Sequence, residues 1–178
     1  MRQSSRVAAF AMLLSGFSPA TLTATTVVSV TTEELALRSD EVIIATVRAS
    51  ASRWEHGLII TDHELVVDAA IRGRALEHGT IFLRTPGGVV GRIAQVIPDA
   101  PVLEVGHSYL FFLAGGVGPV RFLTHLTAAV LPVSVTVHGE VVAQPSTSLL
   151  LDRSHNATAT PPPTPLPAML DRIRAVHP

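Results

Sequence analysis

Cysteine and lysine are both missing from the 178 residues. Without cysteine, the chain has no disulfide framework, no thiolate ligand for a metal and no cysteine nucleophile. Without lysine, it has no Schiff-base chemistry and no lysine to complete a phosphate-binding P-loop. The fold must therefore be held together by burial and hydrogen bonds, and several large enzyme classes are excluded.

Aromatic residues and charge are also scarce, at 4% and 15% of the chain, whereas hydrophobic residues reach 47%. A chain this apolar is not disordered over most of its length, and its core must be aliphatic. Valine and isoleucine favour extended backbone because branching at Cβ restricts their rotamers in helices. The net charge of −1 and the singly scattered arginines exclude an electrostatic surface for nucleic acid.

The N-terminal residues have the pattern of a secretory signal peptide. Arg2 and Arg6 are followed by the apolar run Val7–Leu14, and small residues follow it. Cleavage is expected after Ala20 or Ala24, with Ala24 preferred, so residues 1–24 form the signal peptide of a periplasmic or extracellular protein. The apolar run is shorter than the roughly 20 residues that a membrane span needs. We expect no membrane span in the mature chain.

Residues 25–145 have the pattern of a mainly β domain. A short helix is expected after Thr31, because Thr31 and Glu34 have the spacing of a capping box. Locally paired strands separated by turns then indicate a small, partly open antiparallel β-barrel. The expected strands are Glu41–Ala51, Leu58–Ile71, Thr80–Arg84, Ser108–Leu113, Val120–Leu126, Leu131–Val137 and Glu140–Ala143.

The first two expected strands carry the clearest alternation. In the first, Ile43, Ala45, Val47 and Ala49 would share one face, and a turn is expected at Trp54–Gly57. In the second, alternate residues from Ile59 to Ile71 share a face that includes His63. The opposite face carries the carboxylates Asp62, Glu64 and Asp68. They indicate either a solvated outer face or a cation site, and the solvated face is the preferred interpretation.

The segment between the third and fourth expected strands is rich in glycine and proline, and it contains Pro86-Gly87-Gly88 and Gly91. It is too interrupted for a helix and too apolar for a solvated linker. We expect it to fold over the open side of the sheet.

The C-terminal part changes in composition. Residues 146–164 form a Pro/Ser/Thr-rich linker, and residues 165–178 form an amphipathic helix. The helix places Leu166, Met169, Leu170, Ile173 and Val176 on one stripe. That stripe either packs back on the barrel, as is usual, or binds a partner.

Catalytic and metal motifs are incomplete. His63-Glu64 begins like the zinc motif H-E-x-x-H, but Val67 replaces the second histidine, and in a strand the two side chains point to opposite faces. We expect His63 to be a hydrogen-bonded residue of the semi-buried face. Ser108 follows His107 without the glycines of a nucleophile elbow, and the glycine-rich segments match no phosphate-loop pattern. No cofactor, metal or catalytic residue is assigned.

Two segments together resemble a family of uncharacterised exported bacterial proteins. They are LALRSDEVIIATVRASASRWEHGLIITDHELVVDAAIRG and TPGGVVGRIAQVIPDAPVLEVGHSYLFFL, and the resemblance covers Leu35–Ala143. It implies an OB-like β-barrel, distantly netrin/TIMP-like, with no established activity. Asp99 stands where the family pattern has glycine, and His63 where a smaller or β-branched residue is usual. The zinc-chelating N-terminal cysteine of the TIMP-type inhibitors is absent.

Taken together, the sequence predicts an exported, non-enzymatic β-barrel that binds another secreted or envelope protein. An exposed glycine-rich loop beside a lone tryptophan is typical of a contact surface. The candidate partner-binding residues are Trp54, Pro86, Gly87, Gly88, Arg92 and Gln95. Trp54 could equally cover an edge of the core. Two other interpretations stay open: a passive envelope component, and a hydrolase or metal-dependent enzyme using His63, His107, His125 or His138 with nearby carboxylates.

Overall fold

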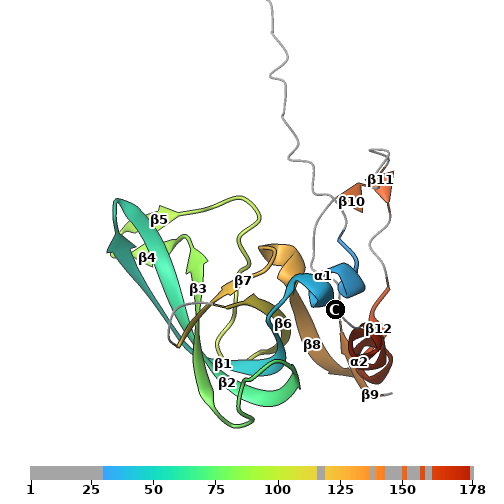
Figure 1. The fold of residues 1–178 in the computed structure, drawn as a ribbon. Coiled ribbons are helices and arrows are strands. Elements are labelled where there is room, and N and C mark those ends of the chain that lie inside the picture. The colour runs from blue at the N-terminus through green and yellow to red at the C-terminus, as the bar shows by residue number, and fades with distance from the viewer. Residues whose placement is uncertain are drawn as a thin grey trace, which may run out of the picture.

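The computed structural model describes residues 30–115, 119–136, 139–142, 150–151, 157–158 and 162–176. The predicted signal peptide lies outside these residues, as do His138 and residues 116–118. This described part of the chain is mainly β, as predicted, and contains two α-helices (Figure 1). In order, the elements are α1 (Thr32–Arg38), β1 (Glu41–Glu55), β2 (Leu58–Arg72), β3 (Thr80–Pro86), β4 (Gly88–Val90), β5 (Ile93–Gln95), β6 (Ser108–Ala114), β7 (Val120–Leu123), the 3-10 turn η1 (Thr127–Ala129), β8 (Val130–Thr136), β9 (Gly139–Val142), β10 (Leu150–Leu151), β11 (Ala157–Thr158), β12 (Thr164–Pro165) and α2 (Leu166–Ala175).

Five strands pair in a ring in the order β1–β2–β3–β7–β6 and back to β1. Between the described strands every pairing is antiparallel except that of β3 with β7. This parallel contact is short and pairs only Phe82 with Val120 and Leu83 with Arg121. Few residues therefore close the ring between β3 and β7. The arrangement agrees with the predicted small, partly open barrel. Beyond the ring, β8, β9 and β12 extend the sheet from β6.

Apolar side chains form two cores, one on each side of the sheet. The first lies inside the ring and includes Val47, Leu65, Leu83 and Phe111. The second lies between the sheet and the two helices and includes Phe112. Strand β6 contributes to both cores, which explains why Tyr109–Leu113 is continuously apolar instead of alternating.

The helices are fixed by the contacts that their sequences predict. Thr31 and Glu34 form the capping box at the start of α1, with both side chain to backbone distances at 3.1 Å. At the other end of α1, Arg72 of β2 donates to the carbonyl of Ala36 at 2.8 Å. Helix α2 packs back on the sheet, as expected. The buried residues of its stripe are Leu166, Met169 and Ile173.

The first strand differs from the prediction in two ways. It runs on to Glu55, so Trp54 lies in β1 and only His56 and Gly57 form the turn. A register shift between Val47 and Ala49 then reverses the alternation, and Ala49 is exposed instead of buried. The extra residue of such a bulge moves every later side chain to the other face. Ser50, Ser52 and Trp54 therefore share the face of His63, Thr61 and Ile59.

Several boundaries near the C-terminus also shift. Strand β7 ends at Leu123 instead of Leu126, because the chain turns into the 3-10 turn at Thr127. Within the predicted linker, β10 pairs with β11 and β12 pairs with β9. Strand β12 thus places the start of α2 beside the sheet. No helix in the described part of the chain has the length and hydrophobicity that a membrane crossing requires.

Candidate functional site

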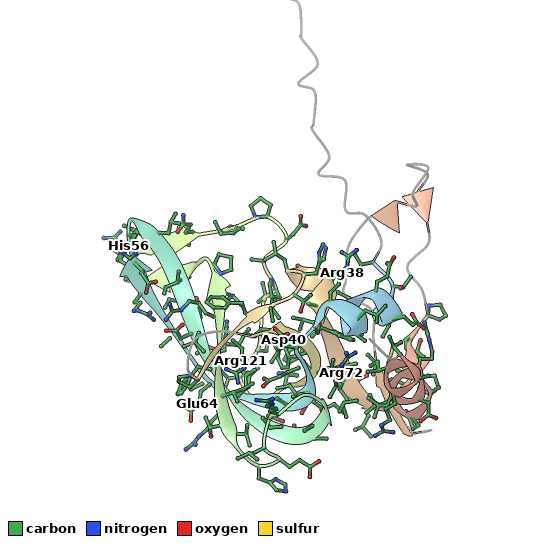
Figure 2. All side chains as sticks on the ribbon, in the orientation of Figure 1. Arg38, Asp40, His56, Glu64, Arg72 and Arg121 are labelled. Atoms are coloured by element: carbon green, nitrogen blue, oxygen red, sulfur yellow. The ribbon has the colours of Figure 1, made fainter. Side chains whose placement is uncertain are left out.

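The hairpin of β1 and β2 is longer than the ring that it belongs to. Strand β6 pairs with β1 only from Glu41 to Thr46, whereas β2 pairs with β1 as far as Glu55. The part beyond the ring, Arg48–Glu55 with Leu58–Glu64, is called the outer arm here. His56 lies at its end, far from the helices (Figure 2). The sequence forms this tight end because His56 and Gly57 both adopt positive φ, at 50° and 81°, as a two-residue hairpin turn requires.

The β4–β5 hairpin covers the inner face of the outer arm (Figure 1). Two hydrogen bonds attach it to Ile59: the Gly87 amide donates to the Ile59 carbonyl at 2.8 Å, and the Ile59 amide donates to Gln95 Oε1 at 2.6 Å. The hydroxyl of Thr61 donates to the Gly87 carbonyl at 2.7 Å. The predicted fold of this segment against the sheet is therefore confirmed.

Large apolar side chains are exposed on the outer arm and on the β4–β5 hairpin, which lie together at this end of the molecule (Figure 1). By the strand registers, Leu58 lies on the opposite face of the outer arm from Trp54, and Val89 on the opposite face of its hairpin from Ile93. Trp54 is 49% exposed, Leu58 55%, Val89 61% and Ile93 54%. These four residues are called the tip patch. The Val89 amide lies 3.3 Å from Ser52 Oγ, which connects β4 to β1 two residues before Trp54. Large apolar side chains held in water by a hydrogen-bonded scaffold are typical of a contact surface.

The six predicted partner-binding residues separate into two groups. Trp54, Pro86 and Arg92 are exposed at this end of the molecule, where a partner would reach them. Gly87, Gly88 and Gln95 instead hold the hairpin on the sheet. Gly87 is buried, and Gly88 and Gln95 are only partly exposed. Trp54 keeps about half of its surface in water and half against the protein, which is compatible with both interpretations of this residue.

His63 lies in the polar layer under the β4–β5 hairpin and is only 5% exposed. Its Nδ1 lies 2.7 Å from Ser50 Oγ, and its Nε2 lies 3.0 Å from Thr85 Oγ1. Burial lowers the pKa of His63, and the charge of Asp62 only partly opposes this effect. The expectation of a hydrogen-bonded histidine is confirmed.

The Ser50–His63–Thr85 row contains a hydroxyl within reach of a neutral imidazole, which is one component of nucleophilic catalysis. Catalysis also needs donors for an oxyanion and a cleft that holds the substrate. Ser50 is exposed on β1, and the partner of Nε2 is a hydroxyl instead of a carboxylate. The row therefore lacks the features of a hydrolase site.

The carboxylates on the opposite face of β2 are all engaged within the sheet. Asp62 accepts hydrogen bonds from Arg53 and Arg84, and Glu64 accepts one from Arg48 at 3.2 Å. Asp68 accepts one from Thr46 at 2.7 Å. Burial raises the pKa of Asp62, but the hydrogen bonds from Arg84 and Arg53 outweigh this effect and lower it overall. The sequence analysis preferred a solvated outer face, and the structure adds that its carboxylates are held by ion pairs and by the hydroxyl of Thr46.

Among the described residues, the candidate histidines His107 and His125 form no metal-binding group with His63. His107 lies 3.4 Å from Glu104 in an exposed pair, and His125 is exposed before η1. In the ranges that the structure describes, no group of three His, Cys, Asp or Glu side chains could hold a metal ion. His138, the fourth candidate, lies outside those ranges.

Sequence reasoning missed the inner polar layer of the outer arm, formed by Ser50, Ser52, Thr61 and Thr85. The signal was present in the alternation of serine and alanine before Trp54, but the bulge hides which of them face His63. No protein-family model and no curated protein sequence matches this chain. The fold and its contacts therefore carry the functional argument.

Proposed function

We propose that this chain is an exported, non-enzymatic OB-like β-barrel that binds a partner protein through the tip patch. The observation that carries the proposal is the exposure of Trp54, Leu58, Val89 and Ile93 at one end of the molecule. Tryptophan is the residue type most often dominant in binding energy when a partner buries it. Because the hairpin beneath is fixed by hydrogen bonds, the patch is organised before binding, which lowers the entropy cost of association.

The ring order supports the OB-like assignment. Counted along the chain, β1, β2, β3, β6 and β7 are the first to fifth strands of the ring. They pair in the order first, second, third, fifth, fourth and back to the first, with the third and fifth parallel. In OB folds, oligonucleotides and oligosaccharides bind on the face of the second and third strands and at the loops between the first and second and the fourth and fifth strands. The tip patch lies at the first of these loops. This is an argument from fold analogy, and it agrees with the family resemblance of Leu35–Ala143.

The chemistry of the outer arm favours a protein as the partner. The arginines of the outer arm and Arg84 of β3 are engaged with carboxylates of the same sheet, including Arg53 with Glu55 at 2.7 Å and Arg84 with Asp62 at 2.8 Å. A nucleic-acid surface needs basic side chains directed at phosphates. The tip exposes four large apolar side chains, and Arg92 is exposed in the turn between β4 and β5.

The binding role is tested by capturing envelope and secreted proteins on the immobilised full-length chain and measuring the affinity of the purified binder. We expect Trp54→Ala to weaken binding by at least about tenfold, as for a central interface aromatic. The matched control is Phe122→Ala, another aromatic residue that is 44% exposed but lies on β7. If both variants lose the same affinity for the partner, or if no binding protein is captured, the proposal is contradicted.

Export is tested separately by N-terminal sequencing of the protein recovered from the periplasm of a Gram-negative host. The pattern of Arg2, Arg6 and Val7–Leu14 supports removal of residues 1–24. We expect the mature chain to begin at Thr25, or at Thr21 if the enzyme cuts after Ala20. An intact N-terminus on cytosolic protein would contradict export.

A further inference from the structure

One edge of the outer arm has no backbone partner within the described residues. On this side of β1, pairing with β6 ends at Thr46. The last backbone contacts are at Val47, whose amide donates to His107 at 3.0 Å and whose carbonyl accepts from Gly106 at 2.8 Å. The bulge that follows turns the strand away from the ring. Residues Arg48–Glu55 on this side are called the open edge.

The geometry of the hairpin identifies the groups that face outward along the open edge. A two-residue turn makes the flanking residues, Glu55 and Leu58, a hydrogen-bonded pair. Hydrogen-bonded and non-hydrogen-bonded pairs alternate along an antiparallel ladder. Arg53 and Ala51 therefore bond to β2, whereas the N–H and C=O groups of Ser50, Ser52 and Trp54 point away from it. An extended chain lying beside β1 could bond all of these groups.

Apart from the bulge at its start, the open edge lacks the devices that usually prevent strand addition. Proteins protect such edges with proline, lysine, other charged side chains or bulges that twist the edge away. Ala49–Ser52 are small and contain no proline, and the chain has no lysine. The flanking Arg48 and Arg53 are drawn across the sheet into ion pairs with Glu64 and Asp62 of β2. Their charges are neutralised on the outer face of the sheet, so they do not repel a strand that approaches the edge.

We propose that the open edge of β1 binds an extended segment of a partner protein, which adds to the sheet as a new strand. This inference rests on the proposed function and names its binding mode. Only a polypeptide backbone offers donors and acceptors at the spacing of Ser50, Ser52 and Trp54. Side chains on the inner face of the added strand would meet Trp54 and Val89, so that face is apolar, and the segment carries no lysine or arginine opposite Arg53.

The inference is tested with eight-residue peptides selected from a random phage-displayed library on the full-length chain and then synthesised. Binding should protect the amides of Ser50, Ser52 and Trp54 from hydrogen exchange and leave those of Ala51 and Arg53 unchanged. Methylating the peptide's own amide nitrogens one at a time should abolish binding at every second position, because only alternate amides face β1.

A pair of variants isolates the edge amide from its side chain. Ser50→Pro removes an outward N–H, whereas Ser50→Ala keeps it and removes only the hydroxyl that contacts His63. We expect Ser50→Pro to weaken peptide binding by on the order of tenfold and Ser50→Ala to leave it nearly unchanged. Thermal unfolding of both variants shows whether the sheet is intact. If Ser50→Pro fails to fold, the methylated peptides and the exchange pattern still decide the question.

The outcomes separate this inference from the proposed function. Selected peptides that depend on Trp54 but are indifferent to Ser50→Pro and to methylation would overturn strand addition and leave the tip patch as a binding surface. Peptides indifferent to both Trp54→Ala and Ser50→Pro would overturn both, as would a failure to select any peptide. A free chain that is dimeric by light scattering, with Ser50, Ser52 and Trp54 already protected, would assign the open edge to a second copy and overturn the inference.

Discussion

Gly88 lies where the β4–β5 hairpin comes closest to the sheet. Its φ of 134° is open to glycine, and a Cβ on it would collide with the hydroxyl oxygens of Thr61 and Ser52. Both hydroxyls already share a hydrogen bond at 2.8 Å, so neither can move freely. The backbone must approach this closely for the hairpin to cover the inner face of the outer arm.

We therefore expect Gly88→Ala to lower the free energy of unfolding by about 1–3 kcal/mol, as overpacking and backbone strain usually do. The measurement is urea unfolding followed by circular dichroism. Gly91→Ala is the matched control: Gly91 also has positive φ, at 61°, but no atom lies within 4 Å of a Cβ built on it. Equal costs for the two variants would mean that backbone strain alone, and not the close approach, sets the requirement for glycine.

Gln95 and Arg92 show how residue type alone misleads about a site. Both were predicted to contact a partner, because both are polar residues of a glycine-rich segment. Only the structure shows that Gln95 accepts a hydrogen bond from the Ile59 amide at 2.6 Å, whereas Arg92 is exposed. The side-chain amide reaches across 36 positions of sequence, and no local pattern encodes such a contact.

The β4–β5 hairpin is the element whose attachment the tip patch depends on. Gln95→Leu keeps the size of the side chain but leaves the buried amide of Ile59 without its acceptor. We expect a loss of about 1–3 kcal/mol of stability, together with faster hydrogen exchange in β4 and β5. Peptide or partner binding should weaken as well, because Val89 and Ile93 of the tip patch lie on this hairpin.

Arg92→Ala tests the same element without disturbing its attachment. We expect its stability to stay within about 0.5 kcal/mol of the parent, as for most surface substitutions, and hydrogen exchange in the hairpin to be unchanged. If the backbone amides of β4 and β5 exchange equally slowly in Gln95→Leu and Arg92→Ala, Gln95 does not anchor the hairpin. Its contribution must then be sought in direct contacts with a partner.

Strands and helix α1 could be predicted from the sequence because their signals are local. Alternation from Ile59 to Val67 and the capping box at Thr31 involve neighbours a few positions apart. The bulge after Val47 could not be predicted, because it depends on how β1 pairs with β2 and where β6 ends. Because of the bulge, Ser50 and Trp54 lie on the same face of the hairpin as His63. The bulge also begins the open edge.

The closure of the molecule is a property that no segment carries by itself. The parallel contact of Phe82 with Val120 joins positions far apart in sequence, and the ion pair of Arg121 with Glu41, at 2.8 Å, brings β7 to the start of β1. Helix α2 then covers the sheet through Met169, and Arg172 bonds Glu33 of α1 at 2.7 Å. Burial on both sides of β6 therefore makes the ring and the helices one cooperative unit.

Such a unit should respond to pH as a whole through its few perturbed groups. Burial lowers the pKa of His63 below its ordinary value of 6.5. The unfolded chain therefore takes up this proton more readily than the fold, so stability present above about pH 6.5 is lost on acidification. Hydrogen bonding to Arg172 lowers the pKa of Glu33, and the arginine bonds to Asp62 do the same there. Their contribution is present above the ordinary values of 4.5 and 3.8, and it is lost in a second step as the pH falls further.

We expect the free energy of unfolding, measured by urea titration, to be highest near neutral pH and to fall in these two ranges. His63→Gln should reduce the loss of unfolding free energy between pH 7.5 and pH 5.5, because glutamine carries no titrating group. The loss at lower pH, which comes from the carboxylates, should stay as it is. His107→Gln, which alters an exposed histidine, should leave both steps as they are. Two results would contradict this expectation: a parent protein that is equally stable at pH 7.5 and pH 5.5, or a His63→Gln variant that loses as much stability as the parent over that range. Either result would show that the fold accepts a charged imidazole under the hairpin, and that water reaches the polar layer more than its burial indicates.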